Sequence, residues 1–466
     1  MIGGRAATVS VLPGRCIISV GNPKSVLPSG WTWALLSDLA DLGTGHTPSR
    51  KHPKYWGGNI PWIGVRDAGR HHGGTINETM QHVTQLGLAN SSARLLPKET
   101  VCLSRTASVG YVVVMGKPMA TSQDFVTWSC GKYLEPHFLM KALLAEGEDI
   151  RRFGEGSTHT TIYFPEVKAF HIGLPPVIEQ RRIVAKTNRL SRKSKSARDH
   201  LNQVSLLVDK YKQAILLAAF RGSLTEGWRA ANAGYGGSWS ERTLAEIAAI
   251  GTGSTPKRGK QRYYSDGHIP WVTSGVVNSS VVLSAEEHIT DAAIRETNCK
   301  VFPAGTIVMA MYGEGQTRGR VAVLGIAAAT NQALAAIRVK ANGPAIPSFV
   351  LWHLRSGYLA LREKAAGGVQ PNLNLGIIKA WRLRLPSKEE QGEIVGRIEV
   401  AFAWIERLSS EANSGRKLID YLDQAILAKA FRGELVPQDP NDEPASVLLE
   451  RIRAEQFPAA TEIRAR

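Results

Sequence analysis

Two stretches of the chain carry apolar residues at an alternating spacing of four and three. The first runs from Ile183 to Ala218 and the second from Ile394 to Ile426, and Tyr211 and Leu422 are among the repeated positions. This spacing is typical of a helix that buries one seam against a second helix. Residues that commonly start and end helices flank both stretches: Pro176 and Ser387, then Gly222 and Gly433.

The pattern therefore predicts two long helices, over residues 175–222 and 386–433. At 1.5 Å per residue, each would be on the order of 65 Å long. Outside them the chain has short apolar runs between turns rich in Gly and Pro. The strand candidates include residues 100–104, 110–114, 306–310 and 320–324. We predict two mixed α and β domains of class α+β over residues 27–174 and 223–385. A flexible N-terminal tail over 1–26 and a C-terminal tail over 434–466 with a short helix complete the chain.

The chain repeats its own sequence motifs in order. Residues 31–48 are answered by residues 239–256 at an offset of 208, and both segments end in Gly-Thr-Gly-x-Thr-Pro. Further matches are Ile60-Pro61-Trp62 with Ile269-Pro270-Trp271, Ala120 to Gln123 with Ala329 to Gln332, Glu179-Gln180 with Glu390-Gln391, and Phe220-Arg221-Gly222 with Phe431-Arg432-Gly433. We therefore predict a tandem repeat in which each unit is a globular domain followed by a long helix.

A heptad pattern by itself is often a device for dimerisation. Here the duplicated partner helix lies in the same chain, which favours an antiparallel intramolecular coiled coil. That arrangement would place the two globular domains at opposite ends of the paired helices, related by a pseudo-twofold axis.

The formal charge of +17 and a pI near 9.8 favour a polyanionic partner. Nucleic acid is preferred to a membrane, because no apolar run approaches the roughly 20 residues that span a bilayer. The four cysteines are far apart and suggest neither a zinc site nor a disulfide framework, which fits a reducing cytoplasm: Cys16, Cys102, Cys130 and Cys299.

The duplicated motifs resemble those of the specificity subunit of Type I restriction-modification systems. The resemblance extends over nearly the whole chain from about residue 27. It rests on Gly-Thr-Gly-x-Thr-Pro and Ile-Pro-Trp, each twice, on Leu-Pro-Pro-x-x-Glu-Gln-x-x-Ile-Val, and on Gln-Ala-Ile-Leu with Phe-Arg-Gly-x-Leu, again twice. The second copy departs from the pattern with Pro386-Ser387 in place of Pro-Pro, and serine also caps a helix well.

This resemblance implies two target recognition domains that each read one half of a bipartite DNA site, with the helices fixing the gap. It also implies a scaffold for two methyltransferase subunits and, in the full complex, two restriction and translocation subunits. The chain would hold no cofactor of its own, because S-adenosylmethionine, ATP and Mg²⁺ would belong to those partners. We expect a non-catalytic protein of bacterial defence in the cytoplasm of a bacterium or archaeon.

An enzyme is the alternative to a non-catalytic subunit, and it would require a catalytic motif. The chain has no Gly-Lys-Ser/Thr phosphate-binding motif, and the glycines of residues 313–319 have a spacing typical of a turn. Residues 166–168 offer only half of a nuclease site. We predict no catalytic residue and no metal ligand. A structural coiled-coil adaptor without DNA binding, and a nuclease or methyltransferase with an unrecognised site, remain the alternatives.

Basic and hydrogen-bonding residues in corresponding loops of the two domains are the candidate DNA contacts, because phosphates bind Arg and Lys whereas base edges bind Arg, Gln, Ser and Thr. They are His46, Ser49, Arg50, Lys51, Arg66, Arg105, Ser108, Thr158 and His159 in the first domain, and Lys257, Arg258, Lys260, Arg262, Ser274, Gln316, Arg318, Arg320 and Gln370 in the second. We expect Trp62 and Trp271 to be core residues.

The first long helix is strongly basic on its outer faces. The residues responsible are Arg181, Arg182, Lys186, Arg189, Arg192, Lys193, Lys195 and Arg198. The second helix carries several glutamates, so some of these charges are expected to pair across the helices. The surplus would face DNA or an acidic partner helix, and the sequence does not choose between them.

Overall fold

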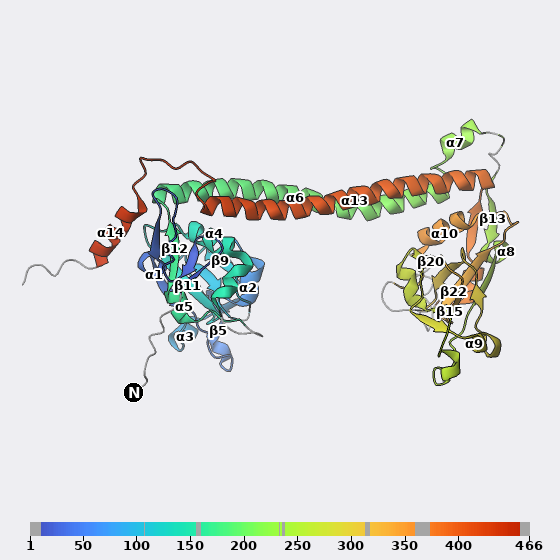
Figure 1. The fold of residues 1–466 in the computed structure, drawn as a ribbon, viewed down its shortest axis with the longest axis horizontal. Coiled ribbons are helices and arrows are strands. Elements are labelled where there is room, and N and C mark those ends of the chain that lie inside the picture. The colour runs from blue at the N-terminus through green and yellow to red at the C-terminus, as the bar shows by residue number, and fades with distance from the viewer. Residues whose placement is uncertain are drawn as a thin grey trace, which may run out of the picture. The chain divides into compact units, whose positions relative to one another are not determined.

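The computed structural model describes residues 11–106, 108–154, 160–232, 234, 238–312, 317–358 and 373–456. Its contacts divide the chain into two units. Unit 1 comprises Met1–His200 together with Gly415–Arg466, and unit 2 comprises Leu201–Ser414. The two long helices, α6 and α13, each contribute one part to each unit (Figure 1). Unit 1 is therefore built from both ends of the chain.

In the part of unit 1 that the structure describes, the strands form three sheets. The four-stranded sheet has the order β1 (Leu12–Pro13), β2 (Ile18–Val20), β12 (Phe170–Leu174), β3 (Thr32–Leu35). The five-stranded sheet has the order β4 (Ala40–Thr44), β11 (Phe125–Cys130), β8 (Val101–Ser104), β9 (Val112–Met115), β6 (Thr75–Ile76). The three-stranded sheet has the order β10 (Ala120–Thr121), β5 (Trp56–Ile63), β7 (Gln81–Val83). β8 and β9 are buried along their whole length, as expected for unbroken runs rich in valine.

The helices of unit 1 are mostly short. They are α1 (Leu36–Leu39), η1 (Pro53–Tyr55), α2 (Val65–Arg70), α3 (Gln85–Ala89), α4 (Pro136–Glu146), η2 (Gly147–Phe153), α5 (Phe164–Lys168) and α14 (Ala445–Gln456), beside the first part of α6 (Val177–Arg221) and the last part of α13 (Lys388–Phe431). α14 packs Leu449 and Ile452 into the core of the unit, so the C-terminal helix belongs to the N-terminal domain.

The prediction of a flexible tail over residues 1–26 is wrong for residues 11–26, which are the part of this range that the structure describes. β2 pairs with β12, and Ile18 is 1% exposed. The buried carboxylate of Glu146 accepts hydrogen bonds from the backbone N–H groups of Ile17 and Ile18 at 3.0 and 2.9 Å, and from those of Arg15 and Cys16. These long-range bonds order a segment that has no recognisable local pattern of its own.

Unit 2 repeats this plan. Its five-stranded sheet has the order β14 (Ala248–Thr252), β22 (Leu334–Val339), β19 (Ile307–Ala310), β20 (Val321–Leu324), β16 (Val281–Val282). Its other sheets are β17 (Glu287–Ile289), β15 (Ile269–Val272), β21 (Ala328–Thr330), β18 (Val301–Phe302), and the pair β13 (Ser240–Thr243), β23 (Arg382–Leu385). Its helices are α7 (Glu226–Ala231), α8 (Leu244–Ile247), η4 (Gln261–Tyr263), η5 (Ser274–Asn278), α9 (Asp291–Glu296), α10 (Pro347–Ser356) and α12 (Leu375–Lys379).

The strand orders confirm the predicted duplication. β4, β11, β8, β9 and β6 of unit 1 correspond in order to β14, β22, β19, β20 and β16 of unit 2. The short strand formed by the Ala-Thr motif pairs in parallel with the strand of the Ile-Pro-Trp motif in both units, Ala120 beside Trp62 and Ala329 beside Trp271. The fold is a tandem repeat of α+β domains joined by two long helices.

The long helices pair in antiparallel fashion within each unit. In unit 1, Arg198 forms ion pairs with Asp420 and Asp423 at 2.8 and 3.0 Å. In unit 2, Lys212 lies 3.6 Å from Glu406. These contacts confirm the expected pairing of some charges across the helices.

The predicted seam is buried only in part. Ile183, Ile394 and Ile398 are fully enclosed, whereas Tyr211 and Leu422 are 60% and 53% exposed. Two helices alone cover a narrow stripe, and a larger apolar side chain at the edge of that stripe stays in contact with solvent.

A buried glutamine explains why the Glu-Gln motif recurs at the start of both long helices. In unit 2, the Gln391 amide donates to the carbonyls of Pro344 and Pro386 at 2.8 and 2.9 Å, and its oxygen accepts the N–H of Ile346 at 2.9 Å. Gln180 makes the same three types of contact in unit 1. Each glutamine fixes its helix to the globular domain.

We expect Gln391→Ala to lower the free energy of unfolding of unit 2 by roughly 2–4 kcal/mol, because buried backbone groups lose their partners. Gln203→Ala changes the same residue type at an exposed position of α6 and is the control. Urea denaturation followed by circular dichroism measures both. Equal stability of the two variants would contradict the anchoring role of Gln391.

His353 on α10 gives unit 2 a predicted sensitivity to acid. Its ring lies among Phe220, Phe349 and Trp381, and Nδ1 accepts a hydrogen bond from the Trp381 indole at 3.3 Å. Burial lowers the pKa of His353 to about 4. The native state therefore holds this imidazole neutral at pH values where the unfolded chain is protonated.

Because the unfolded chain binds the extra proton, stability should be complete above about pH 6.5 and should fall by roughly 3 kcal/mol as the pH drops toward 4. His353→Gln keeps a hydrogen-bond acceptor but does not titrate, so it should flatten this part of the curve. Urea denaturation between pH 4 and 7 measures both proteins. An unchanged slope in the variant would show that another group is responsible.

Candidate nucleic-acid interface

Four hydrogen bonds hold the Gly-Thr-Gly-x-Thr-Pro loop of unit 1 in place, and two of them join it to the Ala-Thr-Ser-Gln segment. The hydroxyl of Thr44 donates to the Phe125 carbonyl at 2.8 Å, and the hydroxyl of Thr47 donates to Oε1 of Gln123 at 2.6 Å. The backbone N–H of His46 donates to the Thr121 carbonyl at 2.9 Å. The indole of Trp62 donates in turn to the His46 carbonyl at 3.1 Å.

Unit 2 reproduces this arrangement atom for atom. Thr252 donates to Leu334 at 2.8 Å, and Thr255 donates to Gln332 at 2.6 Å. The Ser254 N–H donates to Thr330, and the Trp271 indole donates to the Ser254 carbonyl at 3.1 Å. Trp62 and Trp271 are 5% and 2% exposed, which confirms that they are core residues.

The second glycine of the motif is required by close approach of the backbone. A Cβ on Gly45 would overlap the Thr121 carbonyl, and a Cβ on Gly253 would overlap the Thr330 carbonyl. At Gly251, two residues earlier, a Cβ would meet no atom within 4 Å. In unit 2, therefore, the second glycine and not the first sets how closely the loop lies against the strand.

Arg50, which follows the loop in unit 1, lies over two tryptophan rings. Its guanidinium carbon is 4.7 Å from the ring centre of Trp56 and 5.9 Å from that of Trp62. One nitrogen donates to Oε1 of Gln81 at 3.1 Å. Among the described residues, no carboxylate lies within ion-pair distance of Arg50. An exposed guanidinium held by neutral groups keeps its full charge for an anionic ligand.

Arg258 is the counterpart of Arg50 at the offset of 208. It lies 5.2 Å from the ring centres of both Tyr264 and Trp271. Its acceptor, however, is the carboxylate of Glu287, which forms a two-point ion pair with one bond of 3.0 Å. Glu287 and Gln81 occupy the same register position, opposite Trp271 and Trp62. The same site therefore carries a free cation in unit 1 and a neutralised pair in unit 2.

The remaining loop residues predicted as DNA contacts are exposed in both units. His46, Ser49, Lys51, Lys257, Lys260 and Arg262 are the members of this set. Arg262 is ion-paired with Glu296, and the Lys260 ammonium donates to the Tyr263 hydroxyl at 3.3 Å. Lys51 and Lys257 have no carboxylate partner in the part of the chain that the structure describes.

A second group of predicted contacts lies on the turns that follow the strands. Arg66 is exposed on α2, and Ser274 starts η5 at the equivalent place in unit 2. Arg320 donates to Asn278 of η5 at 3.3 Å, and these two residues line a cavity of about 320 Å³. The structure thus brings the start of β20 and η5 together.

Arg105, Ser108 and Arg318 are less accessible. The Arg105 guanidinium packs 5.0 Å from the Phe164 ring centre, and burial lowers its pKa. Ser108 is half-buried in the turn between β8 and β9, and its carbonyl accepts the Ser104 hydroxyl. Arg318 is also half-buried. Arg105 therefore contributes to packing as well as to charge. Four further predicted contacts lie outside the described residues: Thr158, His159, Gln316 and Gln370.

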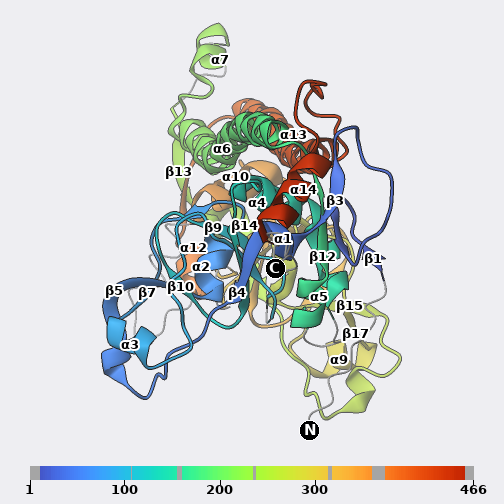
Figure 2. The ribbon, with the colours of Figure 1, turned by 90° about the vertical axis from the view of Figure 1, so that its left-hand side faces the viewer.

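In each unit taken by itself, the loop with its arginine and aromatic rings lies at the end remote from the long helices. Figure 1 shows β5 and α3 of unit 1, and β15 and α9 of unit 2, on the side away from α6 and α13. Figure 2 agrees for both. The exposed basic loops and the helices are therefore separate surfaces.

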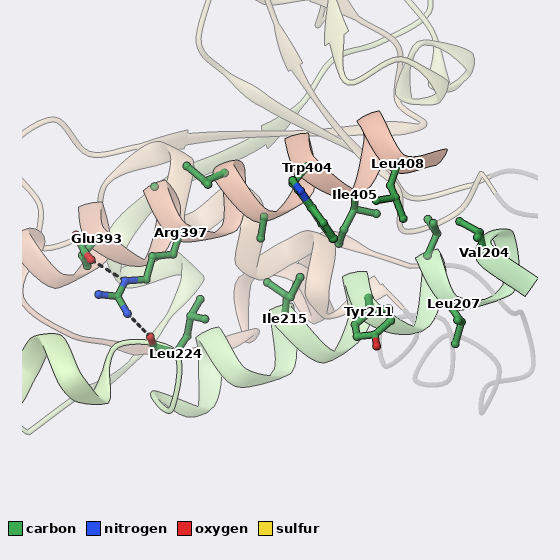
Figure 3. A pocket seen from close by; sticks show the side chains of 14 residues that line it. Val204, Leu207, Tyr211, Ile215, Leu224, Glu393, Arg397, Trp404, Ile405 and Leu408 are labelled. Atoms are coloured by element: carbon green, nitrogen blue, oxygen red, sulfur yellow. Dashed lines mark hydrogen bonds and ion pairs between the residues drawn. The ribbon is translucent and has the colours of Figure 1, made fainter. Parts of the chain in front are cut away.

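A second surface, which the sequence did not reveal, is an apolar groove of about 1030 Å³ between α6 and α13 in unit 2 (Figure 3). Val400 and Trp404 are 73% and 61% exposed on its α13 wall, and Tyr211 stands on its α6 wall. Arg397 closes one end through hydrogen bonds to Glu393 and to the Leu224 carbonyl at 2.6 and 2.8 Å. The sequence did contain one signal for this groove, because Val400 and Trp404 are large apolar residues that lie outside the predicted seam.

Among the described residues, no cluster of His, Cys, Asp or Glu could hold a metal ion. None of the helices in that part of the chain combines the length and apolarity needed to cross a membrane. The free thiols are buried or half-buried, and burial raises the pKa of Cys16 to about 11. The molecule is a duplicated α+β protein with matched basic loops and two connecting helices. These features place it in the class of proteins that carry two paired recognition domains.

Comparison with known proteins identifies the family. The model for the Type I restriction modification DNA specificity domain matches residues 28–206 and 237–411, once in each repeat. The chain belongs to this family and is a specificity subunit rather than an enzyme. The StySPI specificity subunit of Salmonella potsdam is 23% identical over 93% of this chain and 97% of its own length. The EcoKI specificity subunit of Escherichia coli K12 is also 23% identical, over 92% and 96%.

Two solved structures share the fold. The HsdS subunit of Thermoanaerobacter tengcongensis has a TM-score of 0.59 at 20% identity and covers 89% of this chain and 99% of that one. A chain from a study of complex assembly and conformational transition of the type I R-M system has a TM-score of 0.66 at 19% identity, covering 88% and 100%. The similarity to these two solved structures concerns the fold alone.

Proposed function

We propose that each unit reads one half of a bipartite DNA sequence through the exposed loops at its helix-remote end. The observation that carries this proposal is the repeated loop, which holds Arg50 and Arg258 on matching aromatic rings in the two units. Arg on an aromatic platform suits phosphate and guanine, and the neighbouring Lys51 and Lys257 add charge for the DNA backbone. Two different loops around a common scaffold suit two different half-sequences.

The paired helices then set the gap between the half-sequences and carry the partner subunits. α6 and α13 have 45 and 44 residues, and the exposed groove of unit 2 is too apolar for a permanently solvated surface. We propose two methyltransferase subunits on these helices and, in the full complex, two restriction and translocation subunits. S-adenosylmethionine, ATP and Mg²⁺ would be bound by those partners, in the cytoplasm, and the chain itself would hold no cofactor.

The test is to co-express the chain with the methyltransferase subunit encoded beside its gene and to map methylated adenines across the host genome by single-molecule sequencing. A bipartite motif with a fixed gap is expected. Replacing the loop region of unit 1 or of unit 2 should change only one half of the motif. Deleting one heptad from each of α6 and α13 should shorten the gap and leave both half-sequences unchanged.

Partner assembly without methylation and without salt-sensitive DNA binding would overturn the proposal in favour of a structural adaptor. Methylation or cleavage of DNA by the isolated chain would overturn it in favour of an enzyme with an unrecognised site.

A further inference from the structure

Each unit contains a cavity at the same place in its fold. In unit 2 the cavity lies between η5, the start of β20 and the last turn of α10, and in unit 1 it lies between the residues after α2, the start of β9 and the end of α4. Matching hydrogen bonds fix the correspondence, because the Val114 N–H donates to the Gly74 carbonyl at 3.0 Å and the Val323 N–H donates to the Ser280 carbonyl at 3.1 Å. The duplicated fold therefore builds this cavity twice.

Two positions that line the cavity carry an arginine in unit 2 and an uncharged residue in unit 1. At the start of β20 and of β9, Arg320 corresponds to Tyr111. In the last turn of α10 and of α4, Arg355 corresponds to Leu144 at the offset of 211. Because unit 1 builds the same cavity without these arginines, the fold itself does not require them.

The charges that line the unit 1 cavity cancel one another. The guanidinium groups of Arg15 and Arg151 lie beside the carboxylates of Glu148 and Asp149, and Arg151 forms an ion pair with Glu148 at 2.8 Å. His72 also lines this cavity and accepts a backbone N–H at Nδ1, and burial lowers its pKa. The imidazole is therefore neutral at neutral pH and adds no charge.

The unit 2 cavity has a different character, because its described lining holds both arginines and no carboxylate. Arg355 is half-buried, and its guanidinium carbon lies 4.9 Å from the ring centre of Trp352. Within the described ranges, no carboxylate lies within ion-pair distance of Arg355, and burial lowers its pKa. A half-buried charge normally has a counter-charge, which stacking on Trp352 does not supply. The described residues thus leave this guanidinium available for a bound anion.

We propose that the unit 2 cavity binds one phosphate group between Arg355 and Arg320, and that the unit 1 cavity does not. The planar guanidinium group can donate two parallel hydrogen bonds to phosphate oxygens. Hydroxyl and amide groups, which also bind phosphate, line the same cavity; they belong to Asn278, Ser279, Ser280 and Tyr358. The volume of about 320 Å³ lies at the small end of the range for ligand sites, roughly 300–1,000 Å³.

The phosphate would belong either to the backbone of bound DNA or to a free nucleotide. The cavity is formed by η5, β20 and α10, and not by the loop that holds Arg258 on its aromatic rings. It is therefore a second binding point in unit 2, beside the proposed reading loop. DNA as the source rests on the proposed function, whereas a free nucleotide as the source does not.

Two substitutions, each with a matched control, test the site. Arg355→Leu introduces the residue that unit 1 has at this position, and Arg338→Leu removes the same charge from an exposed position of β22. Asn278→Asp gives Arg320 a carboxylate partner without a change in size, and Asn342→Asp makes the same change at another exposed position. Fluorescence anisotropy of the chain bound to its methyltransferase subunit measures DNA binding, and calorimetry of the purified full-length chain measures AMP binding.

The two sources of phosphate give different results. If DNA supplies the phosphate, Arg355→Leu and Asn278→Asp should each weaken binding by about tenfold and lower the dependence on salt by about one ion. The loss should be equal for a duplex with the mapped motif and for one with a scrambled sequence, because phosphate contacts do not read bases. If a free nucleotide supplies it, both variants should lose AMP binding and should bind DNA as their controls do.

Thermal unfolding separates a binding site from a packing role. Arg355→Leu should unfold at the wild-type temperature or above, because it removes a half-buried charge that lacks a counter-charge. A lower unfolding temperature with unchanged binding of DNA and AMP would overturn the inference, since Arg355 would then serve packing alone. Effects on DNA and AMP binding no larger than those of the controls would overturn it as well.

Failure of the proposed function has a different signature, the absence of a methylated bipartite motif. A normal motif, together with variants that bind DNA and AMP as their controls do, would sink only this inference.

Discussion

Gly253→Ala is expected to abolish sequence-specific DNA binding through unit 2. The added methyl group would overlap the carbonyl oxygen of Thr330 and force the Gly-Thr-Gly-x-Thr-Pro loop away from β21. Separation of the loop breaks the hydrogen bond from Ser254 to Thr330 and displaces Trp271, whose indole is bonded to the Ser254 carbonyl. Overpacking of this kind costs roughly 2–3 kcal/mol in stability.

The effect on recognition should exceed the effect on stability, because Arg258 is positioned by the Trp271 ring. With one half-sequence no longer read, affinity should fall toward the non-specific level, on the order of 10³-fold. Fluorescence anisotropy with a duplex that contains the mapped motif measures this loss for the chain bound to its methyltransferase subunit.

Gly251→Ala is the matched control, because it adds the same methyl group in the same motif where no atom lies within 4 Å. It should bind DNA as the wild type does. Gly45→Ala should reproduce the defect in unit 1, with loss of the other half-sequence. Wild-type affinity in Gly253→Ala would show that the contact between loop and strand does not position the reading surface.

Gln81→Glu should weaken DNA binding by about tenfold and lower the dependence on salt by about one ion, as expected when one phosphate contact is lost. The substitution gives Arg50 the carboxylate partner that Arg258 already has in Glu287. That ion pair lowers the pKa of Glu287, so the acid stays ionised at neutral pH and its charge cancels that of the arginine.

Glu287→Gln is the reciprocal change and should strengthen binding by a similar factor, since it frees Arg258 while leaving a hydrogen-bond acceptor in place. Gln203→Glu alters the net charge equally at an exposed position of α6, and it controls for the general loss of positive charge. Binding isotherms at several salt concentrations give both the affinity and the slope. Identical slopes for Gln81→Glu and Gln203→Glu would show that Arg50 does not contact phosphate.

The duplicated loop is the same in the two units in some residues and different in others. The glycine and the threonines are the same in both units because they build the loop, and Gln81 and Glu287 differ because they set the charge of an equally built arginine. The cavity around Arg355 in unit 2 and its counterpart in unit 1 are a second example. After duplication the scaffold has been kept and the exposed chemistry has changed.

The sequence by itself determined the repeat, the two long helices and several of the strands of the globular domains. These features follow from local periodicity and from comparison of the chain with itself, so they need no knowledge of distant contacts. The Gly-Thr-Gly-x-Thr-Pro and Ala-Thr-Ser-Gln motifs were also visible, although the sequence did not indicate that they touch. Residues 46 and 121 are joined only through the tertiary fold.

Only the tertiary structure decided which residues meet across long separations. Glu146 reaches Ile18 over 128 positions and orders a segment expected to be a tail, and α14 returns to the core of the N-terminal unit. Gln81 lies 31 residues from Arg50, and Trp404 lies outside the heptad seam that the sequence showed. Such contacts depend on how strands register and how helices rotate about their axes. Local periodicity does not fix either, so these side chains acquire their roles only when the domain has folded.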